Sequence, residues 1–403
     1  MTIFVAIVGL GLLIFVHELG HFVASLALRM RPRKFYIGFP PAVLKTKRNG
    51  IEYGLGAIPL GGFVKIPGMH RPAPADVDHA LGRALEEAPG LAGPVDRLRG
   101  ALAAGDHDTA RDAVEVLRGL LPQKHVSPGP LAAAEKGLTD LEDALGPDAY
   151  WRAATWKRVI AIAAGPAANV AFAFVLFTVL FMVSGGRATT VVEEVAPDAP
   201  AAAIGLRAGD RIVEIGGTRV GPRDISRTIS GSDGRPLTLV VMREGTRVAL
   251  GPAAARRSDD GVYRLGFVLR GEGLSLPAAA GESGRVTALV TRDVGVAVGR
   301  LVTGDGRKDI ASPVGIVQGS SDAAERGADS FLWVLGLISL SIALLNLLPL
   351  LPLDGGHIVF ALLEGARGRA VRREIYERVS FVGLGLVLLL FFIGLSNDIN
   401  RLS

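Results

Sequence analysis

The chain has 403 residues, of which 49% are hydrophobic, and its mean hydropathy of +0.38 is too apolar for an ordinary soluble enzyme of this length. It contains no cysteine, which excludes disulfides and thiolate metal sites. The net charge is only +5, and the basic residues gather beside apolar runs, so we expect a lipid bilayer as a partner and no nucleic acid.

Four apolar runs are long enough to cross a bilayer, which requires about 20 helical residues. They cover residues 3–28, 159–185, 331–353 and 379–395. No Lys or Arg precedes the first run, so we expect a retained span rather than a cleaved signal peptide. Basic clusters adjoin three of the run ends and indicate the cytoplasmic side: Arg29, Arg31, Arg33 and Lys34; Lys157 and Arg158; Arg367, Arg369, Arg372 and Arg373.

The segments between the runs differ in character. Residues 29–70 alternate apolar residues with Gly and Pro, which predicts a membrane-associated β region whose short strands turn at Gly54, Gly56 and the Gly61-Gly62 pair. Residues 71–156 have helical spacing and predict a cytoplasmic helical insert. The remaining segments are a mostly β domain at 187–270, an extracytoplasmic linker with an amphipathic stretch at 271–330, and spans at 1–28, 157–186, 331–366 and 374–397.

The stretch "FVHELGHFVA" places ionisable residues inside the first apolar run. His17 and His21 are four positions apart, so on a helix they project from one face and can ligate one metal ion. Glu18, beside the first ligand, has the chemistry of a general base for a metal-activated water. The alternative is a pair of helix histidines making ordinary hydrogen bonds, which the cost of burying them in a span disfavours.

A third ligand is expected, because a catalytic zinc site usually has three protein ligands and one open position. "NLLPLLPLDGGH", residues 346–357, offers Asp354 just after Pro349 and Pro352 break the third apolar run. One alternative is that Asp354 only marks the helix end among the lipid headgroups. His357, one turn beyond, is a less favoured candidate for a further ligand.

These motifs together resemble the site-2 protease family of intramembrane zinc metalloproteases, and its bacterial PDZ-containing branch in particular. The resemblance rests on "HELGH", "GGFVK", "AAGPAAN" and "NLLPLLPLDGGH" in that order. It implies one zinc ion on His17, His21 and Asp354, with Glu18 as catalytic base. It further implies that Asn346 holds the substrate backbone and that a β-loop entering the membrane contacts the substrate through Gly61, Gly62, Phe63, Val64 and Lys65.

Two features depart from this resemblance. "ASPVGI", residues 311–316, has Ser312 where the family has glycine, so its backbone turn is an open question. The insert is also longer than the family implies. Its neighbourhood contains four histidines without metal-ligand spacing, which we interpret as surface residues: His70, His79, His107 and His125.

The middle β domain resembles a PDZ domain. In "AAAIGLRAGDRIVEIGGTRV", Gly205 and Gly209 permit tight turns before a strand that begins near Asp210. PDZ domains bind an extended peptide by β-augmentation. The resemblance assigns that binding to Leu265, Gly266, Phe267 and Val268; the alternative is a spacer that limits access by bulk.

The sequence therefore predicts a polytopic α-helical membrane protein with about four transmembrane helices, a small membrane-associated β-sheet and one extracytoplasmic PDZ domain. The resemblance implies zinc-dependent cleavage of single-span proteins, already trimmed on their outer side, in the bacterial cytoplasmic (inner) membrane, as in the release of an anti-sigma factor. Two alternatives remain. One is a proteolytically silent PDZ-containing binder of membrane proteins, and the other is a metal or ion transporter, although the chain lacks the repeated spans common in transporters.

Overall fold

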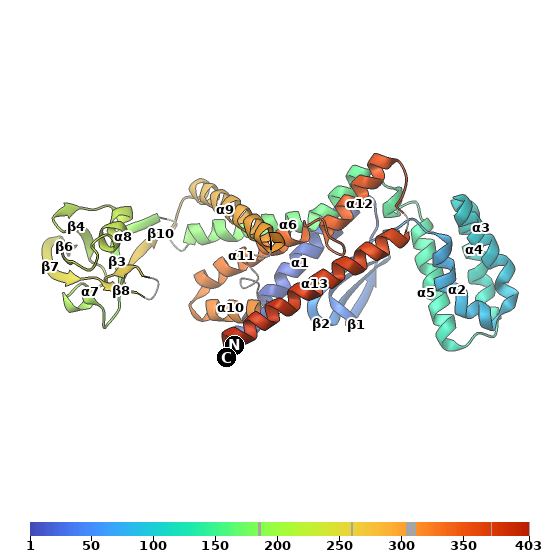
Figure 1. Ribbon diagram of the computed structural model, residues 1–403, viewed down its shortest axis with the longest axis horizontal. Coiled ribbons are helices and arrows are strands. Elements are labelled where there is room, and N and C mark those ends of the chain that lie inside the picture. Colours follow the sequence, from blue (N-terminus) through green and yellow to red (C-terminus); the bar gives the residue numbers. More distant parts are fainter. Residues whose placement is uncertain (184–186, 259–260, 304–311, 372, 403) are drawn as a thin grey trace. The chain divides into compact units, whose positions relative to one another are not determined.

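The computed structural model describes residues 1–183, 187–258, 261–303, 312–371 and 373–402 (Figure 1). The chain forms two compact units. One comprises Met1–Ala173 together with Val290–Ser403, and the other comprises Phe174–Leu289.

Four helices are long and apolar enough to cross a membrane: α1 (Thr2–Ala27), α6 (Thr155–Val183), α11 (Ala328–Asn346) and most of α13 (Arg373–Leu402). They match the four predicted runs and confirm the polytopic helical class. The single span expected over 331–366 is wrong, because α11 ends at Asn346 and a separate helix, α12 (Asp354–Arg367), follows. Pro349 and Pro352 lie in the connection, and neither can continue a helix because proline lacks an N–H donor.

The predicted β region forms two strands, β1 (Lys34–Arg48) and β2 (Ile51–Lys65). The turn between them uses Asn49 and Gly50, with φ values of 51° and 82°, the left-handed pair that a tight hairpin requires. The prediction of turns at Gly54 and Gly56 was wrong, since both are paired within β2. The predicted turn at Gly61-Gly62 lies where β2 bends, because residues 34–37 pair with both 52–55 and 62–65 and Gly61 has a φ of 140°.

The sheet packs on α1 through its inner half. Residues 34–37 of β1 pair with 52–55 on one side and with 62–65 on the other. Phe35 and Ile51 are buried against Phe22 of α1, and these three side chains form the core of this contact. The outer half of the hairpin is exposed, including the apolar Val43, Leu44 and Leu55.

The insert is a helical bundle of α2 (Pro74–Glu87), α3 (Ala92–Ala104), α4 (His107–Leu120) and α5 (Pro128–Leu145), which lie side by side in Figure 1. Short 3₁₀ turns η1 (Pro89–Leu91), η2 (Leu121–Gln123) and η3 (Tyr150–Arg152) connect or follow them. The apolar faces enclose a core of the bundle's own, which includes Leu81, Leu98, Leu117 and Leu138. Of the four histidines expected at the surface, three are exposed and His107 is half-buried against Trp151.

The second unit contains a mostly β, PDZ-like domain whose main sheet has the strand order β10 (Phe267–Glu272), β3 (Arg187–Val195), β4 (Arg211–Ile215), β6 (Pro236–Arg243) and β7 (Thr246–Ala254). The shorter elements are α7 (Pro200–Ala203), β5 (Thr218–Arg219), α8 (Pro222–Ser230), β8 (Arg256–Arg257) and β9 (Tyr263–Arg264). Gly205 and Gly209 have φ values of 77° and 89° and precede β4, which is the predicted arrangement of turns before a strand.

A buried ion pair stabilises this domain. The carboxylate of Asp210, which is 1% exposed, accepts hydrogen bonds from the Arg243 guanidinium at 2.7 and 2.6 Å and from the Arg207 N–H at 2.9 Å. Burial alone raises the pKa of Asp210, but these donors outweigh it and hold the pKa below its usual 3.8. The charged form of Asp210 therefore stabilises the fold.

Two further helices complete the chain, α9 (Leu276–Thr303) and α10 (Pro313–Glu325). Ser312 caps α10, because its hydroxyl accepts from the Val314 N–H at 3.1 Å. Its backbone is extended, with φ −84° and ψ 171°, a conformation that does not require glycine. The N–H groups of Ser312 and Gly315 donate to the buried carboxylate of Asp398 on α13 at 2.7 and 3.2 Å, so α13 anchors the start of α10.

Candidate metal centre and active site

The two histidines of α1 meet Asp354 at the first turn of α12. The Nε2 atoms of His17 and His21 lie 3.3 Å apart, and Asp354 Oδ2 lies 3.1 Å from the first and 3.3 Å from the second. Within the described parts of the chain, this is the cluster of three His, Asp or Glu side chains that suits a metal ion.

The dimensions of this triangle fit zinc. Zinc to nitrogen or oxygen bonds of about 2.0–2.1 Å at tetrahedral angles place neighbouring ligand atoms about 3.3–3.4 Å apart. The three observed separations of 3.1–3.3 Å are close to that value. Two imidazoles and one carboxylate are also a donor set that zinc accepts, and they leave a fourth position open.

The second span orients the His21 ring. His21 Nδ1 lies 3.0 Å from the carbonyl oxygen of Ala161 on α6, so an N–H at Nδ1 donates to that oxygen and Nε2 is left for the metal. Gly165, one turn further along α6, packs against the other side of the ring. A Cβ atom at this position would lie 2.3 Å from His21 Nε2, so only glycine permits the approach.

Strand β2 lies beside Glu18. A Cβ at Gly62 would lie 2.8 Å from Glu18 Cγ. Phe63 stacks on the Tyr36 ring of β1, with centroids 5.0 Å apart and an interplanar angle of 11°. The structure thus brings the "GGFVK" segment next to the candidate base.

The other predicted substrate residues are arranged differently. The Lys65 ammonium lies 2.5 Å from Asp140 Oδ1 and 3.4 Å from Asp143 Oδ2, so it is directed toward the insert. Asn346 is half-buried at the last position of α11.

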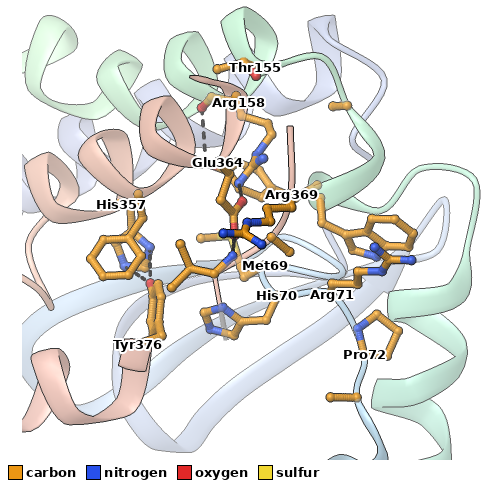
Figure 2. A pocket seen from close by; sticks show the side chains of 18 of the residues that line it. Met69, His70, Arg71, Pro72, Thr155, Arg158, His357, Glu364, Arg369 and Tyr376 are labelled. Carbon is orange, nitrogen blue, oxygen red and sulfur yellow. Dashed lines mark hydrogen bonds and ion pairs between the residues drawn. The ribbon is translucent and has the colours of Figure 1, made fainter. Parts of the chain in front are cut away.

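His357 does not join the metal-ligand cluster within the described residues. Its Nδ1 lies 2.5 Å from the hydroxyl of Tyr376, and both side chains line a cavity of about 580 Å³ (Figure 2). On the same cavity the Arg158 guanidinium of α6 contacts Glu364 of α12 at 2.5 Å, as the figure shows. This nearly buried ion pair holds the end of α12 against the start of α6, and with it the helix that carries Asp354.

The predicted peptide-binding segment of the PDZ-like domain begins in its core. Leu265 is buried, and its carbonyl accepts from the Ala201 N–H at 2.9 Å, while Gly266 adopts a φ of 80°. Phe267 and Val268 open β10, which forms the edge of the main sheet beside β3. An edge strand is the element that β-augmentation requires.

Comparison with known proteins identifies the family. The model of peptidase family M50 matches residues 5–390 of the chain. The chain belongs to peptidase family M50. Similar proteins include the zinc metalloprotease RasP of Bacillus licheniformis, which is 29% identical over 426 residues, covering 100% of this chain and 99% of the relative. A putative zinc metalloprotease of Rhizobium meliloti is 31% identical, with 98% and 95% covered, and the probable protease eep of Enterococcus faecalis is 25% identical, with 99% of each chain covered.

As an M50 peptidase with four apolar helices, the chain is a membrane zinc metalloprotease of the site-2 family. The prediction of this family and enzyme class is confirmed.

Some residues that shape the M50 site have no predicted role. The motif "AAGPAAN" supported only the family resemblance, whereas in the structure Gly165 of that motif contacts a predicted metal ligand and the nearby Ala161 carbonyl orients the same ring. The signal in the sequence was the run of small residues within a span, which permits close helix packing. Arg158 and Glu364 gave no such signal, because a distance of 206 residues separates them along the chain.

Proposed function

We propose that this M50 peptidase cleaves single-span membrane proteins within the bilayer, using one zinc ion held by His17, His21 and Asp354. The observation that carries the proposal is the triangle of ligand atoms 3.1–3.3 Å apart, supplied by a span and by the helix after a broken span. Bound there, zinc supplies Lewis-acid activation of a water and of the scissile carbonyl.

Glu18 is the general base of this mechanism. It follows His17 on α1, and its carboxylate takes the proton of the attacking water and then returns it to the leaving amine. The close approach of Gly62 to the Glu18 side chain puts the base beside β2, where an extended substrate would pass.

The strand residues Gly61 to Lys65 hold the substrate in that extended form. A transmembrane helix hides its peptide bonds, so the segment that is cleaved must unwind and find new partners for its backbone. Addition to β2 supplies such partners by β-augmentation, and Asn346 supplies a side-chain amide. Both lie in the unit that contains the metal-ligand cluster, which supports this assignment.

The topology follows from the basic clusters. Residues 29–156 lie in the cytoplasm of a bacterium, the PDZ-like domain lies outside the inner membrane, and both termini face outward. The substrate reaches the site after its outer part has been trimmed, with Leu265 to Val268 engaging an extended chain end. Cleavage then releases a cytoplasmic fragment that acts as a signal, such as an anti-sigma factor.

The replacement Glu18→Gln tests the mechanism. Glutamine keeps the size of the side chain but cannot accept the proton, so cleavage of a single-span reporter should fall 100- to 10,000-fold, the range typical of a lost general base. Zinc content should stay at the wild-type level, because the three ligands are unchanged. A variant that cleaves at the wild-type rate with normal zinc content would remove Glu18 from the mechanism.

A further inference from the structure

The basic side chains at the inner end of the hairpin are bound by the helical insert. Arg33 precedes β1 and Lys65 ends β2, and the Arg33 N–H donates to the Lys65 carbonyl at 2.7 Å, so both side chains emerge at one end of the sheet. α5 and the residues after it offer three carboxylates there: Asp140, Asp143 and Asp148.

These groups form a connected network. Asp143 joins both basic residues, since it lies 2.7 Å from Arg33 Nε and 3.4 Å from Lys65 Nζ. Asp148 binds the Arg33 guanidinium through two contacts at 2.8 and 3.2 Å, and the side chains of Asp143 and Asp148 are each only 16% exposed. Burial alone lowers the pKa of Arg33, but the bonds to Asp148 and Asp143 outweigh it and raise the pKa. Isolated surface ion pairs contribute little, whereas a partly buried network fixes geometry.

Backbone pairing reinforces this network. The N–H groups of Tyr150 and Trp151 donate to the carbonyls of Pro67 and Gly68 at 2.9 and 3.1 Å. The chain that leaves β2 therefore runs beside the chain that returns from the bundle. Arg71 adds a cation–π contact, 5.4 Å from the centroid of the Trp151 ring.

The anchored end lies close to the active site along β2. Lys65 is three residues from Gly62, a distance of about 10 Å in an extended strand. Gly62 packs against the Glu18 side chain, where an added Cβ would lie 2.8 Å from Cγ. A displacement of Lys65 therefore moves the part of the strand beside the base.

We propose that the helical insert α2–α5 is a positioning domain that fixes β2 against Glu18 through Asp140, Asp143 and Asp148. The bundle has a hydrophobic core of its own, so its helices form a stable unit to which the end of β2 is attached. The ammonium of Lys65 serves as an anchor for the strand and does not contact the substrate. This inference rests on the proposed function, in which β2 presents the substrate to the base.

The test is a double-mutant cycle in the full-length enzyme, with Lys65→Gln, the paired change Asp140→Asn and Asp143→Asn, and their combination. Lys65→Gln should lower kcat/KM for a single-span reporter about tenfold. The acidic change also removes the contact between Asp143 and Arg33, so it should lower kcat/KM at least as much. The combination should lower it no further than the acidic change alone, because Lys65→Gln then breaks no remaining connection. Zinc content should not change. The control is Glu142→Gln, on the same helix as Asp140 and Asp143. It breaks the exposed pair with Arg118 of α4 without touching the hairpin.

Hydrogen exchange supplies a readout that does not depend on activity. The amides of residues 62–65 should exchange about tenfold faster in the cycle variants than in the control, while those of residues 138–141 keep their protection. If the acidic change unfolds the bundle, Lys65→Gln alone still tests the anchor, because Lys65 lies outside it.

Three results would overturn the proposal. The first is unchanged exchange at residues 62–65 in both arms of the cycle. The second is additive losses of kcat/KM, which would mean that Lys65 contacts the substrate directly. The third is a wild-type kcat/KM in all the cycle variants, measured with a reporter that the wild-type enzyme cleaves. If the wild-type enzyme cleaves no reporter, the proposed function fails instead, and the exchange result still decides whether the insert positions β2.

Discussion

The replacement Gly165→Ala should weaken zinc binding although it leaves all three proposed ligands in the sequence. The added Cβ would lie 2.3 Å from His21 Nε2 and 2.6 Å from Cε1, whereas ordinary contact begins near 3.4 Å. The ring and α6 must therefore separate by about 1 Å, several times the tolerance of about 0.2 Å for a zinc ligand. A rotation of the ring would also break its hydrogen bond to the Ala161 carbonyl. We expect zinc affinity to fall about 100-fold, the upper range for a lost supporting contact.

The measurement is zinc content of purified protein across a series of buffered free-zinc concentrations. Gly11→Ala is the matched control, because it adds the same methyl to α1 at a position with nothing within 4 Å. Cleavage of a reporter should fall in parallel with zinc and should recover at high free zinc. A Gly165→Ala protein that binds zinc as the wild type does would refute the close contact between α6 and His21.

Three further outcomes are expected. Asp354→Ala should lower zinc stoichiometry while the protein stays membrane-inserted, because two imidazoles alone bind the ion weakly; full stoichiometry would reassign the ligand. Asp210→Asn should lower the thermal unfolding midpoint of the PDZ-like domain at pH 7 by about 5 °C, measured by hydrogen exchange at β4 and β6. The folded state lowers the pKa of Asp210, so the charged carboxylate stabilises the domain fully above its ordinary pKa of 3.8. This stabilisation is lost as the pH falls through the lower folded-state pKa. The unfolding midpoints of wild type and variant should therefore converge in acid. Reporters fused within residues 71–150 and 187–270 should behave as cytoplasmic and extracytoplasmic, and the reverse would contradict the four-span topology.

The parts of the site that depend on local spacing could be predicted from the sequence. A spacing of four residues puts His17 and His21 on one helix face whatever the tertiary structure. Three ionisable residues, His17, Glu18 and His21, within an apolar run also indicate a functional site. Asp354 required a second argument, the broken third run, because nothing local connects it to α1. The break was correctly located, although its consequence, two helices in place of one span, was not predicted.

What the sequence could not predict depends on long-range contacts. In the sequence Asp140 and Asp143 resemble an ordinary solvated helix face and Asp148 an ordinary turn residue. Only the folded chain brings the three to Arg33 and Lys65. The β region shows a different kind of error. Its many glycines obscured the Asn49-Gly50 pair, the strongest hairpin signal in the segment, so the turn between β1 and β2 was not predicted.

The exposed outer half of the hairpin combines apolar and basic side chains, a combination suited to a membrane surface. Leu44 and Leu55 face each other across the two strands and lie open to the surroundings, with the exposed basic residues Lys45, Lys47 and Arg48 close by. Apolar side chains flanked by positive charge partition into the headgroup region of an anionic bilayer. We therefore expect the headgroups to hold this end of the sheet, so that cleavage by the proposed mechanism varies with the surface charge of the bilayer.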